Sequence, residues 1–277
     1  MDQIIEPQPY TALMPYYPNL ELSKSLCKIS ALTNRAEYEM VRRGYREANI
    51  YHMGSQNWDN QMGEIQEDGL CWLPIRRSYQ YSGFSHKHFP ANELGPNVMV
   101  YGVVARDIDV AKRFRDADLG VSNNGKCDHK IVGKYLGYPD CCVESFSKRF
   151  EKNFDPVFES ALATEHEKIQ DEHIKLSNFN SLLQVHLRYF GIRVIPWFPC
   201  EFNCEESGKK AKQWLDVIQT LDSKMSDFLI ELLNKPSSWD LSLAQVIVKH
   251  PSFMGYVTSY YTKEHQVVEF IPLGEEN

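Results

Sequence analysis

Four of the seven cysteines of this chain fall into two short stretches. Cys141 and Cys142 are adjacent in "LGYPDCCVESF", and Cys200 and Cys204 delimit "CEFNC" further along the chain. Thiolates bind zinc and iron–sulfur clusters, and a pair of thiols can also work as a redox couple. Free cysteine is, in addition, one of the residue types most often buried for packing alone. Because the thiols cluster in two stretches, each beside a proline, the pattern favours a metal or cluster site.

Both stretches lie where a helix is expected to begin. Pro139 suits the first position of a helix predicted over residues 139–152, so Cys141 and Cys142 would lie in its first turn. Cys204 directly precedes a second predicted helix that opens with "EESGKKA". The unpaired N–H groups and the dipole at a helix N-terminus favour negative charge. Thiolates are therefore expected at both places.

The spacing departs from the repeated Cys-x-x-Cys of zinc ribbons. Neighbouring side chains on a helix point about 100° apart, so Cys141 and Cys142 are not expected to bind the same ion. The prediction is three thiolates around a metal, with the fourth position taken by Cys127, His129 or a substrate. An open position is typical of catalytic metal sites. Glu144, one turn into the helix, would hydrogen-bond a ligand or move protons.

The two stretches resemble those of an uncharacterised prokaryotic family, the domain of unknown function 483, over about residues 97–255. Its motifs are His-x-x-x-Gly-x-x-Leu-Gly-Tyr-Pro-x-Cys-Cys and Pro-Cys-x-x-x-Cys-x-x-Ser. The matching residues here are His129, Gly133, Gly137, Tyr138, Pro139, Cys141, Cys142, Pro199, Cys200, Cys204 and Ser207. In the family a histidine often comes shortly before Pro-Cys, where this chain has Trp197 and Phe198. The resemblance therefore makes Cys127 or His129 the more attractive fourth ligand, and it implies no particular activity.

Composition limits the class of protein. Of the 277 residues, 43% are hydrophobic and 24% are charged, as in an ordinary globular chain. A net charge of −7 argues against a broad nucleic-acid or anionic-membrane surface, which would need clustered Lys and Arg. No apolar run approaches the ~20 residues of a membrane span, and the start of the chain, with an acid at Asp2, does not resemble a signal peptide. We therefore expect a cytoplasmic protein with no membrane contact, whereas the sequence carries no signal for an oligomeric state.

The rest of the pattern predicts more helix than strand. An irregular arm over 1–33 is followed by a helix over about 35–48 and by loops with short strands over 49–95. Further helices are expected at 107–118, at 155–176, at 180–190 and after Cys204, the last with a break near Ser223. Strands are expected at 98–104, in "IRVIPWFP" up to Pro199, and as a hairpin in the tail "FMGYVTSYYTKEHQVVEFIPLG".

Because strands and helices do not alternate strictly, an α+β fold is preferred, predominantly helical with a small mixed sheet, over the alternative α/β fold. The predicted organisation is an N-terminal irregular and helical arm, residues 1–95, and a cysteine-motif core domain with a C-terminal hairpin, residues 96–277.

These observations predict a metalloprotein, specifically an enzyme that acts on a small polar substrate at a cysteine-ligated iron–sulfur or zinc site. Its ligands would come from Cys141, Cys142, Cys200, Cys204 and Cys127, its proton-transfer groups would be Glu144 and His129, and its pocket would be lined by Tyr138, Trp197, Phe198 and Ser207. Two alternatives stay open. One is a structural or interaction protein with a closed metal site or buried cysteines, and the other is a thiol redox protein that uses Cys200 and Cys204.

Overall fold

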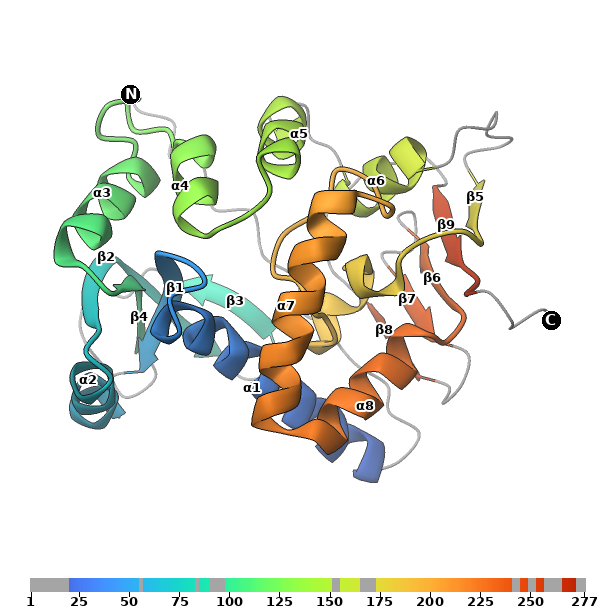
Figure 1. The fold of residues 1–277 in the computed structure, drawn as a ribbon, viewed down its shortest axis with the longest axis horizontal. Helices are drawn as coiled ribbons and strands as arrows, with labels where there is room; N and C mark the ends of the chain where they lie inside the picture. Colours follow the sequence, from blue (N-terminus) through green and yellow to red (C-terminus); the bar gives the residue numbers. More distant parts are fainter. Residues whose placement is uncertain are drawn as a thin grey trace.

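Helices predominate in this chain, and its strands form two sheets that lie at opposite ends of the molecule (Figure 1). A computed structural model describes residues 20–54, 57–82, 85–89, 98–150, 155–164, 173–240, 245–248, 253–256 and 266–272. The predicted α+β class with mainly helical content is confirmed. Two sheets take the place of the one small sheet that was expected, and one of the two is mixed.

The described helices are α1 (Leu20–Arg42), α2 (Trp58–Glu67), α3 (Ile108–Asp118), α4 (His129–Tyr135), α5 (Asp140–Phe150), α6 (Pro156–Thr164), α7 (Glu205–Leu221) and α8 (Ser223–Leu233), with short 3-10 turns η2 (Ser181–Leu183) and η3 (His186–Phe190). The described strands are β1 (Ala48–Gly54), β2 (Cys71–Ser82), β3 (Ser85–Phe89), β4 (Val98–Ala105), β5 (His173–Leu176), β6 (Ser237–Asp240), β7 (Gln245–Val248), β8 (Phe253–Tyr256) and β9 (Val267–Phe270).

The first sheet is antiparallel, in the order β1-β4-β2-β3. One of its two inner strands, β4, is apolar on both faces, because helices cover both. Val103 packs in one cluster with Phe114 of α3, whereas Val104 packs in another with Val41 of α1 and Ile65 of α2. A strand buried on both sides has a nearly continuous apolar sequence. This is why the strand and the helix that follows it could be predicted.

The second sheet has the order β5-β9-β6-β7-β8, in which β5 and β9 are parallel and the other pairs antiparallel. Its buried side chains, among them Trp239 and Phe270, belong to the largest apolar cluster within the described residues. That cluster also takes in Trp214 of α7, Leu229 of α8, and Cys142. The cysteine stretches are therefore part of the core that this sheet shares with α7 and α8.

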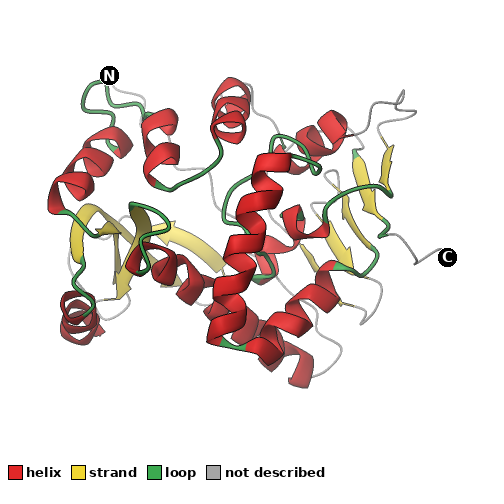
Figure 2. Cartoon of the chain, viewed as in Figure 1, coloured by secondary structure: helices red, strands yellow, loops and turns green. Residues whose placement is uncertain are grey.

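The long helix α1 joins the two halves. Leu26 and Ile29 pack in the cluster of the second sheet, whereas Tyr38 and Val41 pack in a cluster of the first sheet. Helices fill the space between the two sheets (Figure 2). The first sheet also draws strands from both sides of residue 95, since β4 pairs with β1 and β2.

Several elements differ from those expected. The helix predicted from residue 35 begins at Leu20, so residues 20–33 are helical rather than irregular, and residues 1–19 lie outside the described part. The segment expected to be loops and strands contains α2. The end of the helix predicted over 155–176 is the strand β5, whose side chains alternate between exposed and buried as a strand at a sheet edge requires.

Two expected strand features are also corrected. "IRVIPWFP" is buried but forms no strand, because no other strand pairs with it within the described residues. The tail strands do not pair with each other as a hairpin: β8 pairs with β7, and β9 lies between β5 and β6. Among the described helices, none is long and apolar enough to cross a membrane.

Candidate metal centre

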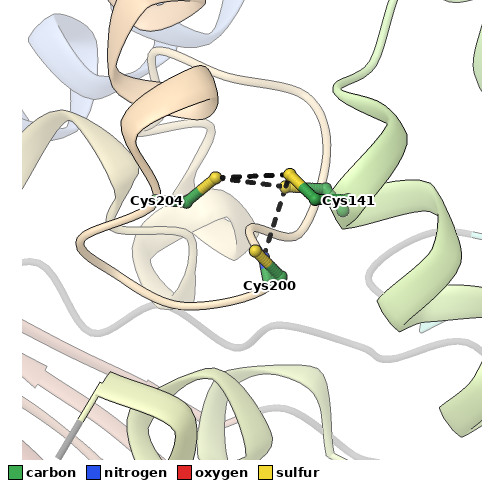
Figure 3. A group of neighbouring side chains, drawn as sticks. Cys141, Cys200 and Cys204 are labelled. Carbon is green, nitrogen blue, oxygen red and sulfur yellow. Dashed lines mark hydrogen bonds between the residues drawn. The ribbon is translucent and has the colours of Figure 1, made fainter.

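Four sulfur atoms meet where α5 begins, beside the loop that leads into α7 (Figure 3). The sulfurs of Cys141, Cys142, Cys200 and Cys204 all lie within 4.8 Å of one another. The Cys204 sulfur is 3.6 Å from that of Cys141 and 3.8 Å from that of Cys142. The sulfurs of the adjacent pair are 3.9 Å apart. The two stretches thus form a single group of donors that could hold a metal ion.

Both adjacent cysteines reach this group, contrary to the expectation from helix geometry. The carbonyl of Pro139 accepts hydrogen bonds from the backbone N–H groups of Cys142 and Val143, each at 3.0 Å, and so starts α5. In this first turn the two Cα–Cβ bonds diverge, but each sulfur lies one rotatable bond further out. Rotation about that bond brings the sulfurs of Cys141 and Cys142 to the same side.

The second half of the site is the start of α7. Cys204 occupies the N-cap position, and its sulfur accepts a hydrogen bond from the backbone N–H of Ser207 at 3.4 Å. A side-chain acceptor at an N-cap stabilises the start of a helix. The backbone N–H of Cys200 donates to the Cys142 sulfur at 3.3 Å. Because N–H donors favour the charged form of an acceptor, both contacts suit thiolates.

Ser207, which is fully buried, contacts the sulfur of Cys142. Its Oγ accepts a hydrogen bond from Trp197 Nε1 at 3.0 Å and lies 3.1 Å from the Cys142 sulfur. An indole N–H can only donate, so the serine hydroxyl accepts there and has its own proton available for the sulfur. The hydrogen bonds from Trp197 to Ser207 and from Ser207 to Cys142 therefore fix the position of the Cys142 sulfur. Ser207 and Trp197 were predicted to line a pocket, and here they act by hydrogen bonding.

Lys210 is a supporting residue that sequence reasoning missed. Its Nζ donates to the carbonyl of Gly137 at 2.7 Å, which ties α7 to the turn before α5. That turn needs glycine, because Gly137 has a φ of +71° and an added Cβ would lie 3.0 Å from Cβ of Arg46. The available signal was position: Lys210 comes three residues after Ser207, on the same face of α7.

The protonation of the four thiols is shared. Hydrogen bonds from Cys142 and then Cys200 hold the pKa of Cys204 far below its usual range. The hydrogen bonds of Cys142 with Cys200 and Cys204, followed by burial, raise the pKa of Cys142 itself. The hydrogen bond to Cys142 lowers the pKa of Cys200, but the one to Cys204 and burial outweigh it and raise this pKa to about 12. Burial, followed by the hydrogen bond to Cys204, raises the pKa of Cys141. Since metal ligands must be deprotonated, binding of an ion here would release protons.

Burial differs among the four. Cys142 and Cys204 are buried, Cys200 is partly exposed, and Cys141 is exposed. The site therefore lies at the edge of the core, and Cys141 is its face toward solvent.

The predicted pocket aromatics lie around this group. The rings of Tyr138 and Trp197 are 5.3 Å apart, and Phe198 stacks on Phe146 of α5 at 6.3 Å. Tyr138 belongs to the buried surroundings of the site, where burial, in the main, raises its pKa to about 12.

The other predicted site residues lie outside the four-thiol group. Cys127 is not one of its members, and its sulfur instead lies 3.6 Å from Nδ1 of His129. His129 contacts Phe146 edge-on, at 5.3 Å between ring centroids. Glu144 is exposed and pairs with Lys148 at 3.4 Å. The expected fourth ligand, Cys127 or His129, is therefore not among the donors that this group brings together; the fourth sulfur of the group comes from the second of the two adjacent cysteines.

Comparison with known proteins gives one family match. The family described as "Protein of unknown function (DUF483)" matches residues 93–232, a range that contains both cysteine stretches. No curated protein and no solved structure matches the chain.

Proposed function

The chain belongs to the DUF483 family, and from that premise we propose that it is a metal-binding protein that holds a single zinc ion through Cys141, Cys142, Cys200 and Cys204. The observation that carries this proposal is the spacing of the sulfur atoms. Tetrahedral zinc has Zn–S bonds of about 2.3 Å, which puts sulfurs about 3.8 Å apart. The separations of 3.6, 3.8 and 3.9 Å among Cys141, Cys142 and Cys204 agree with that value, and the Cys200 sulfur lies within 4.8 Å of the other three.

The same spacing argues against an iron–sulfur cluster, the other cofactor that the sequence suggested. A cluster places several irons and sulfides between its thiolates, which demands wider spacing than one ion does. Four thiolates around a single ion also leave no open position, and this is typical of structural zinc sites. When bound, the ion supplies a bond between α5 and the loop before α7. The chain contributes the N–H and hydroxyl donors that orient its sulfurs.

Purification and elemental analysis test this proposal. One equivalent of zinc per chain is expected, together with a colourless protein, and Cys142→Ser should lose most of the metal. Cys27→Ser is the matched control, because Cys27 is an exposed cysteine of α1 outside the group and should keep the full equivalent. A brown protein that contains iron and sulfide would show that the thiols hold an iron–sulfur cluster and not zinc. A metal-free protein whose mass falls by two hydrogen atoms on oxidation would favour thiol redox chemistry of Cys200 and Cys204.

The exposure of Cys141 favours a second candidate, catalysis on a small polar substrate at the metal. Glu144 comes three residues later on the same exposed face of α5, so a molecule that reaches the solvent side of the site would also meet this carboxylate. This candidate requires that Cys141 give up its place to an outside ligand.

Cobalt substitution separates the two candidates. The absorption of tetrahedral cobalt thiolate should form when Co²⁺ is added, and a closed structural site predicts that azide leaves it unchanged. A spectrum that shifts on azide addition would instead support the catalytic candidate, and Glu144→Gln would then be the variant to assay.

A further inference from the structure

A second group of reactive side chains lies in a groove outside the four-thiol group. The groove has a volume of about 910 Å³ and opens between the end of α3, the turn that follows it, α4 and α5, three helices that lie next to one another in Figure 1. Cys127 and His129 both line it, with the cysteine sulfur 3.6 Å from Nδ1 of the imidazole. A thiol within hydrogen-bond distance of an imidazole is the arrangement in which cysteine becomes a nucleophile.

The backbone holds this pair in place. The turn after α3 folds back on Gly120, whose carbonyl accepts from the N–H groups of Asn123 and Gly125, each at 2.9 Å. Gly120 has a φ of +66°, and an added Cβ would lie against the backbone of Lys126, so the turn is tightly closed. Asp128 then caps α4 by accepting from two backbone N–H groups, both at 3.1 Å. Cys127 and His129 flank this cap, so the backbone of both residues is held by the hydrogen bonds of the turn and the helix start.

The imidazole of His129 is held on two sides. Its edge-on contact with Phe146 sets the plane of the ring, and the carboxylates of Asp118 and Asp128 act on it electrostatically. Asp118 is itself buried and accepts a hydrogen bond from Tyr101 at 2.8 Å. Burial, which outweighs these carboxylates, lowers the pKa of His129 and keeps the ring neutral near pH 7. A neutral ring can take up a proton.

The groove is lined by more basic than acidic side chains, in a chain whose net charge is −7. The basic residues are Arg113, Lys126 and Lys130. Of the acidic ones, Asp128 is committed to its helix cap and Asp116 pairs with Arg115 at 3.4 Å. A local excess of positive charge attracts anions.

We propose that Cys127 and His129 form a nucleophile–base pair and that the groove admits small anionic acyl compounds, such as a carboxylate- or phosphate-bearing ester or thioester. The thiol proton passes to Nδ1 of His129 as the sulfur forms a bond to the acyl carbon. The bond from that carbon to the leaving alcohol or thiol breaks, and the leaving group takes the proton from His129. Water then attacks the acyl carbon, which releases the acid and restores the Cys127 thiol.

Alkylation with two matched reagents tests the pair and the charge of the groove without knowledge of the substrate. Iodoacetate and iodoacetamide react by the same displacement of iodide from carbon, but only iodoacetate carries a negative charge. Rates at Cys127 and Cys27 would be measured in the intact chain by peptide mass spectrometry at pH 7. An ordinary thiol is only a few per cent ionised there, so activation by His129 should make Cys127 roughly 10-fold faster than the exposed Cys27.

Variants assign the effect. His129→Gln should bring the Cys127 rate down to that of Cys27, with His129→Asn as a second variant should the first unfold in a thermal melt. Lys126→Gln with Lys130→Gln should reduce the iodoacetate-to-iodoacetamide rate ratio at Cys127 and leave the ratio at Cys27 unchanged. Equal rates at Cys127 and Cys27, or a Cys127 rate that neither His129 variant changes, would overturn the nucleophile–base pair. An iodoacetate preference at Cys127 no larger than that at Cys27 would overturn the anionic class of substrate.

Discussion

Gly133 of α4 lies so close to Val143 of α5 that a β-carbon on the glycine would stand 2.6 Å from Cγ2 of the valine. The side chain of Val143 therefore packs directly against the backbone of α4 at this point, where the glycine has no side chain of its own. Val143 directly follows the buried Cys142, so the contact also locates the first turn of α5. Because Ser147 of α5 lines the groove and Cys141 and Cys142 of α5 belong to the thiol group, both sites depend on where this helix is packed.

Gly133→Ala should lower the free energy of unfolding by about 1–3 kcal/mol, because the methyl group forces the two helices apart. The matched control is Gly63→Ala in α2, where an added Cβ meets nothing within 4 Å. That change should raise stability by about 0.5–1 kcal/mol, since alanine is the better helix former. Chemical denaturation followed by circular dichroism would measure both, and equal effects of the two changes would contradict the packing argument.

Ser207→Ala should cost about 1–3 kcal/mol, because it leaves the buried indole N–H of Trp197 without its acceptor. Urea denaturation followed by tryptophan fluorescence would report the loss. Ser226→Ala is the control: Ser226 is equally buried, and its hydroxyl has no hydrogen-bond partner among the described residues. Its replacement should be neutral or stabilising. If Ser226→Ala costs as much as Ser207→Ala, the hydroxyl of Ser207 has no special role.

The stability of the fold should fall on acidification through His186. This histidine is fully buried, it stacks on Phe270, and its Nε2 lies 2.8 Å from Oγ of Ser237. Burial lowers its pKa from 6.5 to about 3, so below pH 6.5 the unfolded chain binds a proton that the folded chain does not. Above pH 6.5 His186 is largely neutral in both states and does not lower the free energy of unfolding. Between pH 7 and pH 5 the free energy of unfolding should fall by about 2 kcal/mol through this group.

Denaturation at both pH values checks this expectation, and His186→Gln should remove the loss. Asp155 acts in the opposite direction, because burial, more than any other cause, raises its pKa from 3.8 to about 6 and so favours the folded state as the pH falls. Its carboxylate accepts from the backbone N–H of Phe158 at 2.7 Å. Asparagine can replace that cap, so the loss between pH 7 and pH 5 should be larger in Asp155→Asn than in the unsubstituted chain.

Removal of the proposed metal should lower the melting temperature. A ligand that binds only the folded chain stabilises it by about 4 kcal/mol at a concentration 1,000-fold above its Kd. A chelator should therefore destabilise both the unsubstituted chain and Cys27→Ser, and it should leave Cys142→Ser unaffected. Thermal melts with and without chelator would show the difference, and a chelator effect of equal size in Cys142→Ser would place the metal elsewhere.

Local patterns were sufficient for several elements. The apolar run of β4 followed by α3 could be predicted because strand and helix periodicity are unambiguous there. Asp222, which caps α8 by accepting from the backbone N–H of Met225, matches the predicted break near Ser223. The start of α1 does not follow from local pattern, although Leu22, Leu26 and Ile29 recur at helical spacing, because the Pro- and Tyr-rich residues before them give the whole stretch an irregular composition.

Other features depend on contacts that no local pattern encodes. Trp197 lies in a segment with strand-like composition, yet its indole N–H bonds to Ser207 and the segment wraps the thiols without a partner strand. Which thiols come together likewise depends on tertiary contacts. Helix geometry separated Cys141 from Cys142, whereas the rotamers that the surroundings select bring both sulfurs to Cys204.

Cys142 and Cys200 are 58 positions apart in the chain, and one ion shared between them would close the intervening segment into a loop. A cross-link over that length removes about 4 kcal/mol of conformational freedom from the unfolded chain. The closed segment contains β5, a four-residue strand at the edge of the second sheet whose one partner strand among the described residues is β9. A metal at the thiols would therefore act as a cross-link, and its loss would destabilise the pairing of β5 at a sheet edge that the ion does not contact.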